Sequence, residues 1–207
     1  MLFYVPLIIL TIVLGAQLWL RFFAIRLRNT NFLRTCEFLN KKFFRQIFIF
    51  SILLIAGLCF YQSYQQHQAW SYNELSKFLL PPHQSINYFI FYSFMKFFLP
   101  YLISLAFALL LVFTNKKLNE KGGERFFYDE EIWIAGLAIF LSNWPGWLFY
   151  FTILIAFYFL ISLFYSLFFK KMERISMYWL WLPIAIFGII ISNYWLQNLS
   201  LWSILKI

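Results

Sequence analysis

Acidic residues gather at one point of this 207-residue chain, which holds only 8 Asp and Glu residues in all. Five of them stand beside the start of a long apolar run, namely Glu120, Glu124, Asp129, Glu130 and Glu131. Two carboxylates that share a proton can activate water, one as acid and one as base, which is the chemistry of aspartyl proteases. Carboxylates at the beginning of a helix can equally form a solvated lip that interacts with the helix macrodipole. The residue types alone leave both interpretations open.

The spacing of the acids limits what a catalytic site could contain. Asp129, Glu130 and Glu131 are consecutive, so on a helix their side chains point about 100° apart and only one or two can face a bundle interior. Glu131 lies deepest in the apolar run, and acids inside a membrane commonly mark functional sites. Glu131 and Asp129 are therefore the candidate catalytic residues. A dyad needs a second carboxylate within the membrane, and the sequence offers none on another apolar segment, since Asp129 is its only aspartate.

The elements that must position these acids are membrane helices. Hydrophobic residues make up 63% of the chain and charged residues 12%, against roughly 45–50% and about 25% in soluble domains. Continuous apolar runs of about 17 to 23 residues recur along the chain, close to the ~20 needed to cross a bilayer core. These runs predict an all-α, polytopic transmembrane bundle in a single integral membrane domain, residues 1–207. Six spans are expected, at 2–20, 47–64, 89–113, 126–143, 147–169 and 177–195.

The basic residues predict the orientation of these spans. The loops after the first, third and fifth spans hold 14 of the 17 Lys and Arg residues, whereas Lys77, Lys96 and Lys206 lie on the other side. By the positive-inside rule, the three loops are cytoplasmic and both termini lie on the non-cytoplasmic side. The first span lacks a charged leader region and a cleavage motif, so we expect a retained helix. The net charge of +9 is explained by topology and anionic lipid. Nucleic acid is not an expected partner, and the bilayer is.

Other classes of site find little support. Cys36 and Cys59 fall on opposite sides of the predicted membrane, which excludes a disulfide, and His67 and His83 are isolated. No metal site and no cofactor are therefore expected. A transporter or channel is disfavoured because the spans lack buried charges and broken helices. Between residues 62 and 88, an interfacial helix ending at Pro81-Pro82 is expected.

The fourth and fifth spans form a hairpin at whose cytoplasmic end the acids lie. The segment "SNWPGW" supplies the turn, because Pro145 and Gly146 end one helix and begin the next. Only 13 residues separate Ile132 from Trp144 inclusively, about 20 Å of helix. To reach the cytoplasmic surface, the fourth span must extend back through Glu131, Glu130 and Asp129. The acids then lie on its first turns, near the inner membrane surface.

This hairpin resembles the C-terminal part of type IV prepilin peptidases, membrane aspartyl proteases that cut the leader of pilin precursors. The resemblance rests on Gly122-Gly123 before the acids, on Trp144 thirteen residues after Glu131, and on the Gly146-Trp147 turn. The basic loop "KKMER" and the span "LWLPIAIFGIII" follow in the family's order. The segment "GAQLWLRFFAIRL" is similar to the end of the family's first helix. The resemblance implies a membrane peptidase acting on pilin-like precursors.

The chain also departs from the family's pattern. Cys36 is alone where the family has cysteine pairs, and Asn115 stands near the position of the family's other aspartate. Because Asn cannot serve as acid or base, the expected function is that of a degenerate, non-catalytic relative. The alternative is a structural or assembly subunit of a larger membrane complex, with other membrane subunits or pilin-like precursors as partners. The expected location is a bacterial inner membrane, an organellar inner membrane being the other option.

Overall fold

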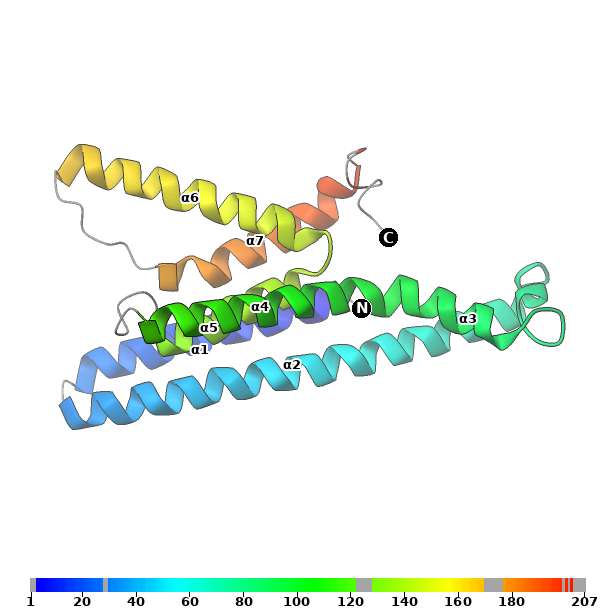
Figure 1. Ribbon diagram of the computed structural model, residues 1–207, viewed down its shortest axis with the longest axis horizontal. Coiled ribbons are helices and arrows are strands. Elements are labelled where there is room, and N and C mark those ends of the chain that lie inside the picture. The colour runs from blue at the N-terminus through cyan, green and yellow to red at the C-terminus, as the bar shows by residue number, and fades with distance from the viewer. Residues whose placement is uncertain are drawn as a thin grey trace.

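The computed structural model describes residues 3–27, 30–121, 128–169, 177–198, 200 and 202. Every regular element in these residues is helical, which confirms the predicted all-α class. The elements are α1 (Tyr4–Leu27), α2 (Thr30–Tyr72), α3 (Ile86–Ser93), α4 (Leu99–Lys121), α5 (Asp129–Ser142), α6 (Gly146–Phe169) and α7 (Trp181–Tyr194), with short 3-10 turns at Ser76–Leu79, Met177–Trp179 and Leu196–Asn198. They form an elongated bundle of roughly parallel and antiparallel rods (Figure 1).

Four of the helical segments are long and apolar enough to cross a membrane: Lys41–Tyr72, Ile86–Lys121, Gly146–Phe168 and Met177–Asn198. They correspond to four of the six predicted spans. The apolar stretch described in α1, Tyr4–Leu20, is shorter. The helix α5, which has 14 residues, measures about 21 Å and is shorter than a ~30 Å hydrocarbon core. The number of six spans stays a prediction.

The short helix α5 occupies the middle of the bundle. Its buried residues include nearly every position from Glu130 to Ser142, and it contacts α1, α2, α4, α6 and α7. A helix that is apolar all round is expected to lie in the protein interior. Because neighbouring helices enclose α5, it need not span the bilayer by itself to be stable there.

The helices α4 and α5 cross closely in the core. A Cβ built on Gly136 would lie 2.6 Å from Cγ2 of Val112 and 3.7 Å from the carbonyl oxygen of Ala108. Small residues at such a crossing let two helices approach closely, which is how membrane helices gain van der Waals contact without a hydrophobic driving force. The crossing fixes the register of the two antiparallel helices, with Val112 opposite Gly136.

The helix α2 is longer than its predicted span of 47–64. It runs without interruption for 43 residues to Tyr72, about 65 Å at 1.5 Å per residue. The expected interfacial helix before Pro81-Pro82 is therefore wrong in its first half, which belongs to α2. Beyond Tyr72 the chain makes only a short 3-10 turn, Ser76–Leu79. The end of α2 and the beginning of α3 together project past the rest of the bundle (Figure 1).

The predicted third span, 89–113, lies within a continuous helical rod, Ile86–Lys121. The rod contains a π-helical turn at Phe94–Phe98, which ends two residues before Pro100. Proline lacks a backbone N–H and its ring clashes with the carbonyl four residues earlier. A wider π turn at this place accommodates Pro100 without ending the rod.

The beginning of α1 and the end of α7 lie side by side, part-way along the bundle and short of the tip formed by α2 and α3 (Figure 1). The ring of Phe3 packs edge-on against Tyr194 at 6.2 Å, and the opposite end carries the first residues of α2 and α5 (Figure 1). Lys41, Lys42, Lys116 and Lys117 belong to that opposite end, whereas Lys77 follows the far end of α2. The basic residues described are thus separated along the bundle axis. Which side of the membrane each end occupies stays a prediction.

Candidate functional site: the acidic start of α5

The site lies at the first turn of α5, where the predicted catalytic residues stand. Tyr128 is the N-cap residue, with extended backbone angles, and Asp129, Glu130 and Glu131 form the first turn. Negative side chains here interact favourably with the positive end of the helix dipole. The Tyr128 backbone N–H donates to Oε2 of Glu131 at 3.2 Å. A Glu three residues into a helix that reaches back to the cap satisfies one of the otherwise unpaired amides.

Glu131 also joins α5 to α7. Its Oε1 accepts a hydrogen bond of 2.9 Å from the indole Nε1 of Trp181, the first residue of α7. Glu131 is 2% exposed and Trp181 is 3% exposed. Burying a carboxylate is costly unless hydrogen bonds compensate for lost water. Both carboxylate oxygens of Glu131 have such a partner, so this side chain serves the packing of two helices.

A buried polar network continues from Trp181 and its neighbour Tyr178 into other helices. The Tyr150 hydroxyl of α6 donates to the carbonyl oxygen of Trp181 at 3.2 Å. The side-chain amide of Gln17 in α1 donates to the carbonyl oxygen of Tyr178 at 2.9 Å. The ring of Tyr178 in turn meets Tyr128 edge-on at 5.9 Å. These contacts tie α1, α5, α6 and α7 together around the residues that precede α7.

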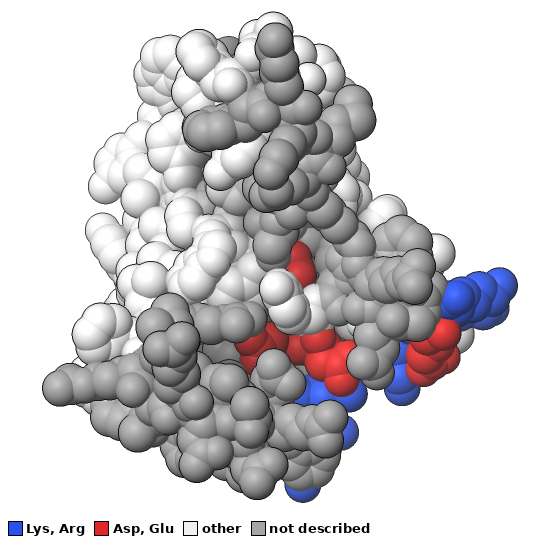
Figure 2. All heavy atoms as spheres, turned by 90° about the vertical axis from the view of Figure 1, so that its left-hand side faces the viewer, with Lys and Arg blue, Asp and Glu red and all other residues white. Residues whose placement is uncertain are grey.

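Asp129 has a different environment from Glu131. Its carboxylate forms an ion pair with Nζ of Lys41 in α2, and the two side chains are 48% and 45% exposed. Seen from the end of the bundle, some acidic side chains lie near the middle of the face and others lie at its edge, where basic side chains also lie (Figure 2). The structure thus gives Asp129 and Glu131 separate partners on separate helices. Asp129 fits the solvated lip, and Glu131 belongs to the interior.

The burial of Glu130 differs from the expectation that Glu131 and Asp129 are the site residues. Glu130 is 4% exposed and therefore joins Glu131 in the interior in place of Asp129. Asn115 and Asn119 are also buried, on the stripe of α4 that includes Val112. Because α4 and α5 are antiparallel with Val112 opposite Gly136, Asn119 is level with the first turn of α5. The burial of Glu130 could have been predicted from the absence of a polar face along α5, because a helix without a polar face is expected to be buried on every side.

Basic residues line a cavity beside the same turn. The cavity, of about 200 Å³, lies between α2, α4 and the start of α5. Its polar lining consists of Lys41, Lys42, Arg45, Lys116 and Asp129, and its apolar lining of Val112, Ile132 and Trp133. Among the described residues of this lining, four side chains are cationic and one is a carboxylate. This arrangement favours an anion over a cation as an occupant.

Metal and cofactor ligands do not gather in the described part of the chain. No group of three or more His, Cys, Asp or Glu residues there could hold a metal ion. Cys59 is buried and donates to the carbonyl oxygen of Phe97 at 3.2 Å. His67 and His83 pack against the rings of Phe89 and Phe78. The side chain of Cys36, and residues Gly122, Gly123, Glu124 and "KKMER", lie outside the described part.

Comparison with known proteins leaves the family open. The chain matches no family model, no curated protein and no solved structure. The resemblance to type IV prepilin peptidases therefore stays a prediction from sequence layout, and the function must be proposed from the geometry.

Proposed function

We propose that this chain is a non-catalytic, multi-pass membrane protein that acts as a structural or assembly subunit of a larger membrane complex. The observation that carries the proposal is the environment of Glu131. Its two oxygens accept hydrogen bonds from the Trp181 indole and the Tyr128 backbone within a closed helix junction. A general acid or base must instead reach its substrate or a water molecule.

The separation of Asp129 from Glu131 supports the same conclusion. An aspartyl-type dyad works because two carboxylates share one proton in a common site. Asp129 is engaged by Lys41 at the surface, while Glu131 is engaged by Trp181 in the interior. Glu130, the other buried acid, is adjacent to Glu131 on one helix, where side chains diverge by about 100°. Catalysis by Glu131 and Asp129 is the competing hypothesis.

The exposed surface of α6 supports a role within a complex. Almost none of its apolar span is buried within the chain, and its second half leans away from the bundle (Figure 1). Large side chains are exposed from the middle of α6 onward, among them Phe157, Phe159, Leu160, Phe164, Leu167 and Phe168. Helices of other membrane subunits, or the apolar helix of a pilin-like precursor, are the partners that this surface suits. Lipid covers the surface when no partner is bound.

A cleavage assay tests the non-catalytic part of the proposal. The wild-type protein and the Glu131→Gln variant, both in mild detergent, are mixed with precursors of pilin-like proteins, and loss of the leader peptide is followed by mass spectrometry. We expect no cleavage by either protein. Cleavage by the wild type that disappears in a stably folded Glu131→Gln variant would establish a peptidase and overturn the proposal.

The subunit role is tested separately by the mass of the particle that is extracted from native membranes. Light scattering after extraction in mild detergent should give a particle heavier than the 25.2 kDa chain and its micelle. Replacing Phe157 and Phe164 by Ala on the exposed face of α6 should release the lighter particle. The matched control is Phe60→Ala and Phe113→Ala, two exposed rings on α2 and α4. A uniform monomer of the wild type would contradict the subunit role.

A further inference from the structure

The cationic cavity beside the start of α5 has no part in the helix junction at Glu131. It draws Lys41, Lys42 and Arg45 from α2 and Lys116 from α4, and it reaches the first turn of α5 at Asp129. Among the described residues, one carboxylate lines it, that of Asp129, and it pairs with Lys41. The described residues that line this space of about 200 Å³ thus include four cationic side chains and one carboxylate. Like charges held together at a membrane surface repel one another, and an anion in their midst relieves this repulsion.

The chemistry of the lining favours a phosphate group. The guanidinium of Arg45 presents paired N–H donors that match phosphate oxygens, and lysine ammonium groups add charge around them. Neither Arg45 nor Lys116 has an ion-pair partner among the described residues. Trp133 on the cavity wall is a residue that suits the headgroup level of a bilayer, where one edge of the indole is apolar and the other is wet.

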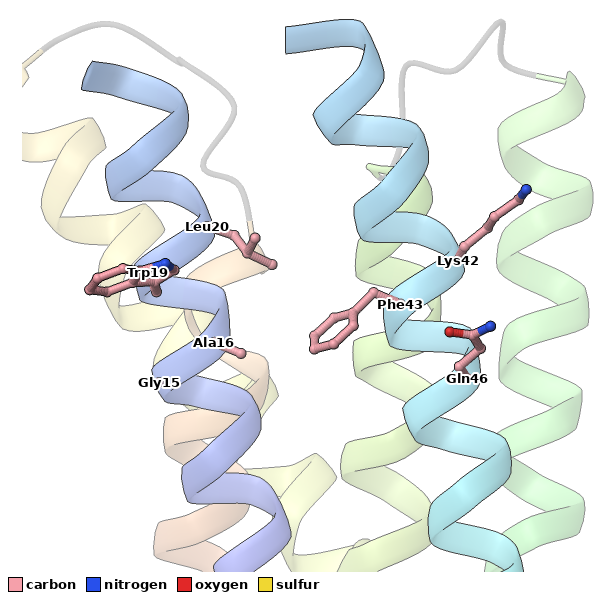
Figure 3. Close-up of a pocket in the computed structure, with 7 residues that line it drawn as sticks. All are labelled: Gly15, Ala16, Trp19, Leu20, Lys42, Phe43 and Gln46. Atoms are coloured by element: carbon pink, nitrogen blue, oxygen red, sulfur yellow. The ribbon is translucent and has the colours of Figure 1, made fainter. Parts of the chain in front are cut away.

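A second, largely apolar cavity lies nearby. A groove of about 600 Å³ between α1 and α2 is lined almost entirely by apolar atoms of Gly15, Ala16, Trp19, Leu20 and Phe43, with Lys42 and Gln46 at α2. Figure 3 shows Ala16 and Leu20 facing α2, Phe43 reaching toward α1, and Lys42 extending from the other side of α2. No atom lies within 4 Å of a Cβ built on Gly15, so the groove is open there.

Lys42 lines both cavities. A ligand with an anionic head and an apolar tail can therefore place its head among the cations and its tail along the groove. We infer that this end of the bundle binds one anionic phospholipid, with its phosphate in the cavity of Arg45, Lys42 and Lys116 and an acyl chain between α1 and α2. Basic pockets between membrane helices are known to hold acidic headgroups in this way. The inference requires membrane insertion but not the subunit role.

The experiment compares the amount of lipid retained by variants of cavity residues with the amount retained by a variant of the neighbouring Lys117. The full chain is reconstituted in detergent with phosphatidylglycerol or with phosphatidylcholine, and bound lipid is counted by native mass spectrometry. Lys116→Gln and Arg45→Gln remove cavity cations on exposed positions. Lys117→Gln is the matched control, because it removes the same charge from the same turn of α4 without lining the cavity. Unfolding midpoints are recorded for every variant.

We expect one phosphatidylglycerol per chain in the wild type and in Lys117→Gln, and no retained phosphatidylcholine. Each cavity variant should bind about fivefold more weakly, and the double variant about 25-fold more weakly, since a basic residue near an anionic surface contributes about 1 kcal/mol. Equal weakening by Lys117→Gln would reduce the effect to general surface charge and overturn the site. The last measurement is the binding of inorganic phosphate. Phosphate binding that depends on Arg45, without phosphatidylglycerol binding, would overturn the lipid assignment.

Discussion

The indole Nε1 of Trp181 donates a 2.9 Å hydrogen bond to Oε1 of Glu131, and both residues are buried. The bond connects the first turn of α5 with the first turn of α7, 50 residues apart in sequence. Through this bond, Glu131, the acid that lies deepest in the apolar run, connects two core helices. We propose that this contact, and not catalysis, is the role of Glu131.

Asp129, on the same turn of α5, should contribute less to the free energy of unfolding than Glu131 does. Asp129→Asn removes an ion pair between two half-exposed side chains, and such pairs contribute about 0–1 kcal/mol because water and salt screen them. We expect the free energy of unfolding to fall by less than about 1 kcal/mol, and the loss to shrink further in high salt. Denaturant titration at two ionic strengths measures both effects. A loss as large as that of Glu131→Ala would show that Asp129 is not a surface residue.

The α4–α5 crossing predicts a strong effect of one methyl group. Gly136→Ala places a Cβ 2.6 Å from Cγ2 of Val112, and a β-branched side chain in a helix cannot easily rotate away. We expect destabilisation of about 1–3 kcal/mol, the usual result of overpacking.

Gly57→Ala is the matched control for this crossing, since nothing lies within 4 Å of a Cβ at that position. It should be neutral or stabilising by up to about 1 kcal/mol, because Ala favours the helix. The additional substitution Val112→Ala should recover part of the loss in Gly136→Ala. Equal effects of the two glycine substitutions would contradict the close crossing.

Gln17 tests the polar network from the side of α1. It is fully buried and donates to the carbonyl oxygen of Tyr178, while its own Oε1 has no hydrogen-bond partner in the structure. Gln17→Met loses one bond but also removes an unsatisfied acceptor, so we expect a change of about 1 kcal/mol or less. Gln17→Glu replaces the donor by a second acceptor and buries a charge, and should destabilise the fold far more. Similar unfolding midpoints for the two variants would exclude the buried amide bond.

The orientation in the membrane can be measured by cysteine labelling. After replacement of Cys36 and Cys59 by Ser, single cysteines are introduced at Lys117 and at Lys77 in a bacterial host. The positive-inside rule predicts that an impermeant maleimide added to intact spheroplasts labels position 77 and leaves position 117 unlabelled until lysis. The opposite pattern would reverse the assignment of both termini.

Local signals in the sequence predicted some helix boundaries well and others poorly. The predicted span 147–169 agrees with α6, Gly146–Phe169, because Pro145 and Gly146 interrupt the helical pattern unambiguously. The end of α2 was missed because its last turns are polar, and these turns were assigned to a separate interfacial helix. There Gln65 and Gln68 donate to the hydroxyls of Tyr61 and Tyr64, four residues earlier, and such pairs stabilise a helix after its apolar run has ended.

The candidate site shows the limit of spacing arguments more clearly. The position of the acids on the first turn of α5 was predictable, since thirteen apolar residues cannot cross a bilayer. The burial of Glu130 and the partner of Glu131 were not, because they depend on which helices enclose α5. No local pattern identifies Trp181 as that partner. The sequence alone could therefore place the acids on the first turn of α5, but it could not assign their role.

The most direct test of that role is a double-mutant cycle between Glu131 and Trp181. Free energies of unfolding are measured in mixed micelles for the wild type, Glu131→Ala, Trp181→Phe and the double variant. The coupling energy isolates their interaction from the effect of each truncation. We expect a favourable coupling of about 1–3 kcal/mol, the range for a buried hydrogen bond to a carboxylate. A coupling below about 0.5 kcal/mol, within the scatter of independent sites, would contradict a structural role for Glu131 and return it to the candidates for catalysis.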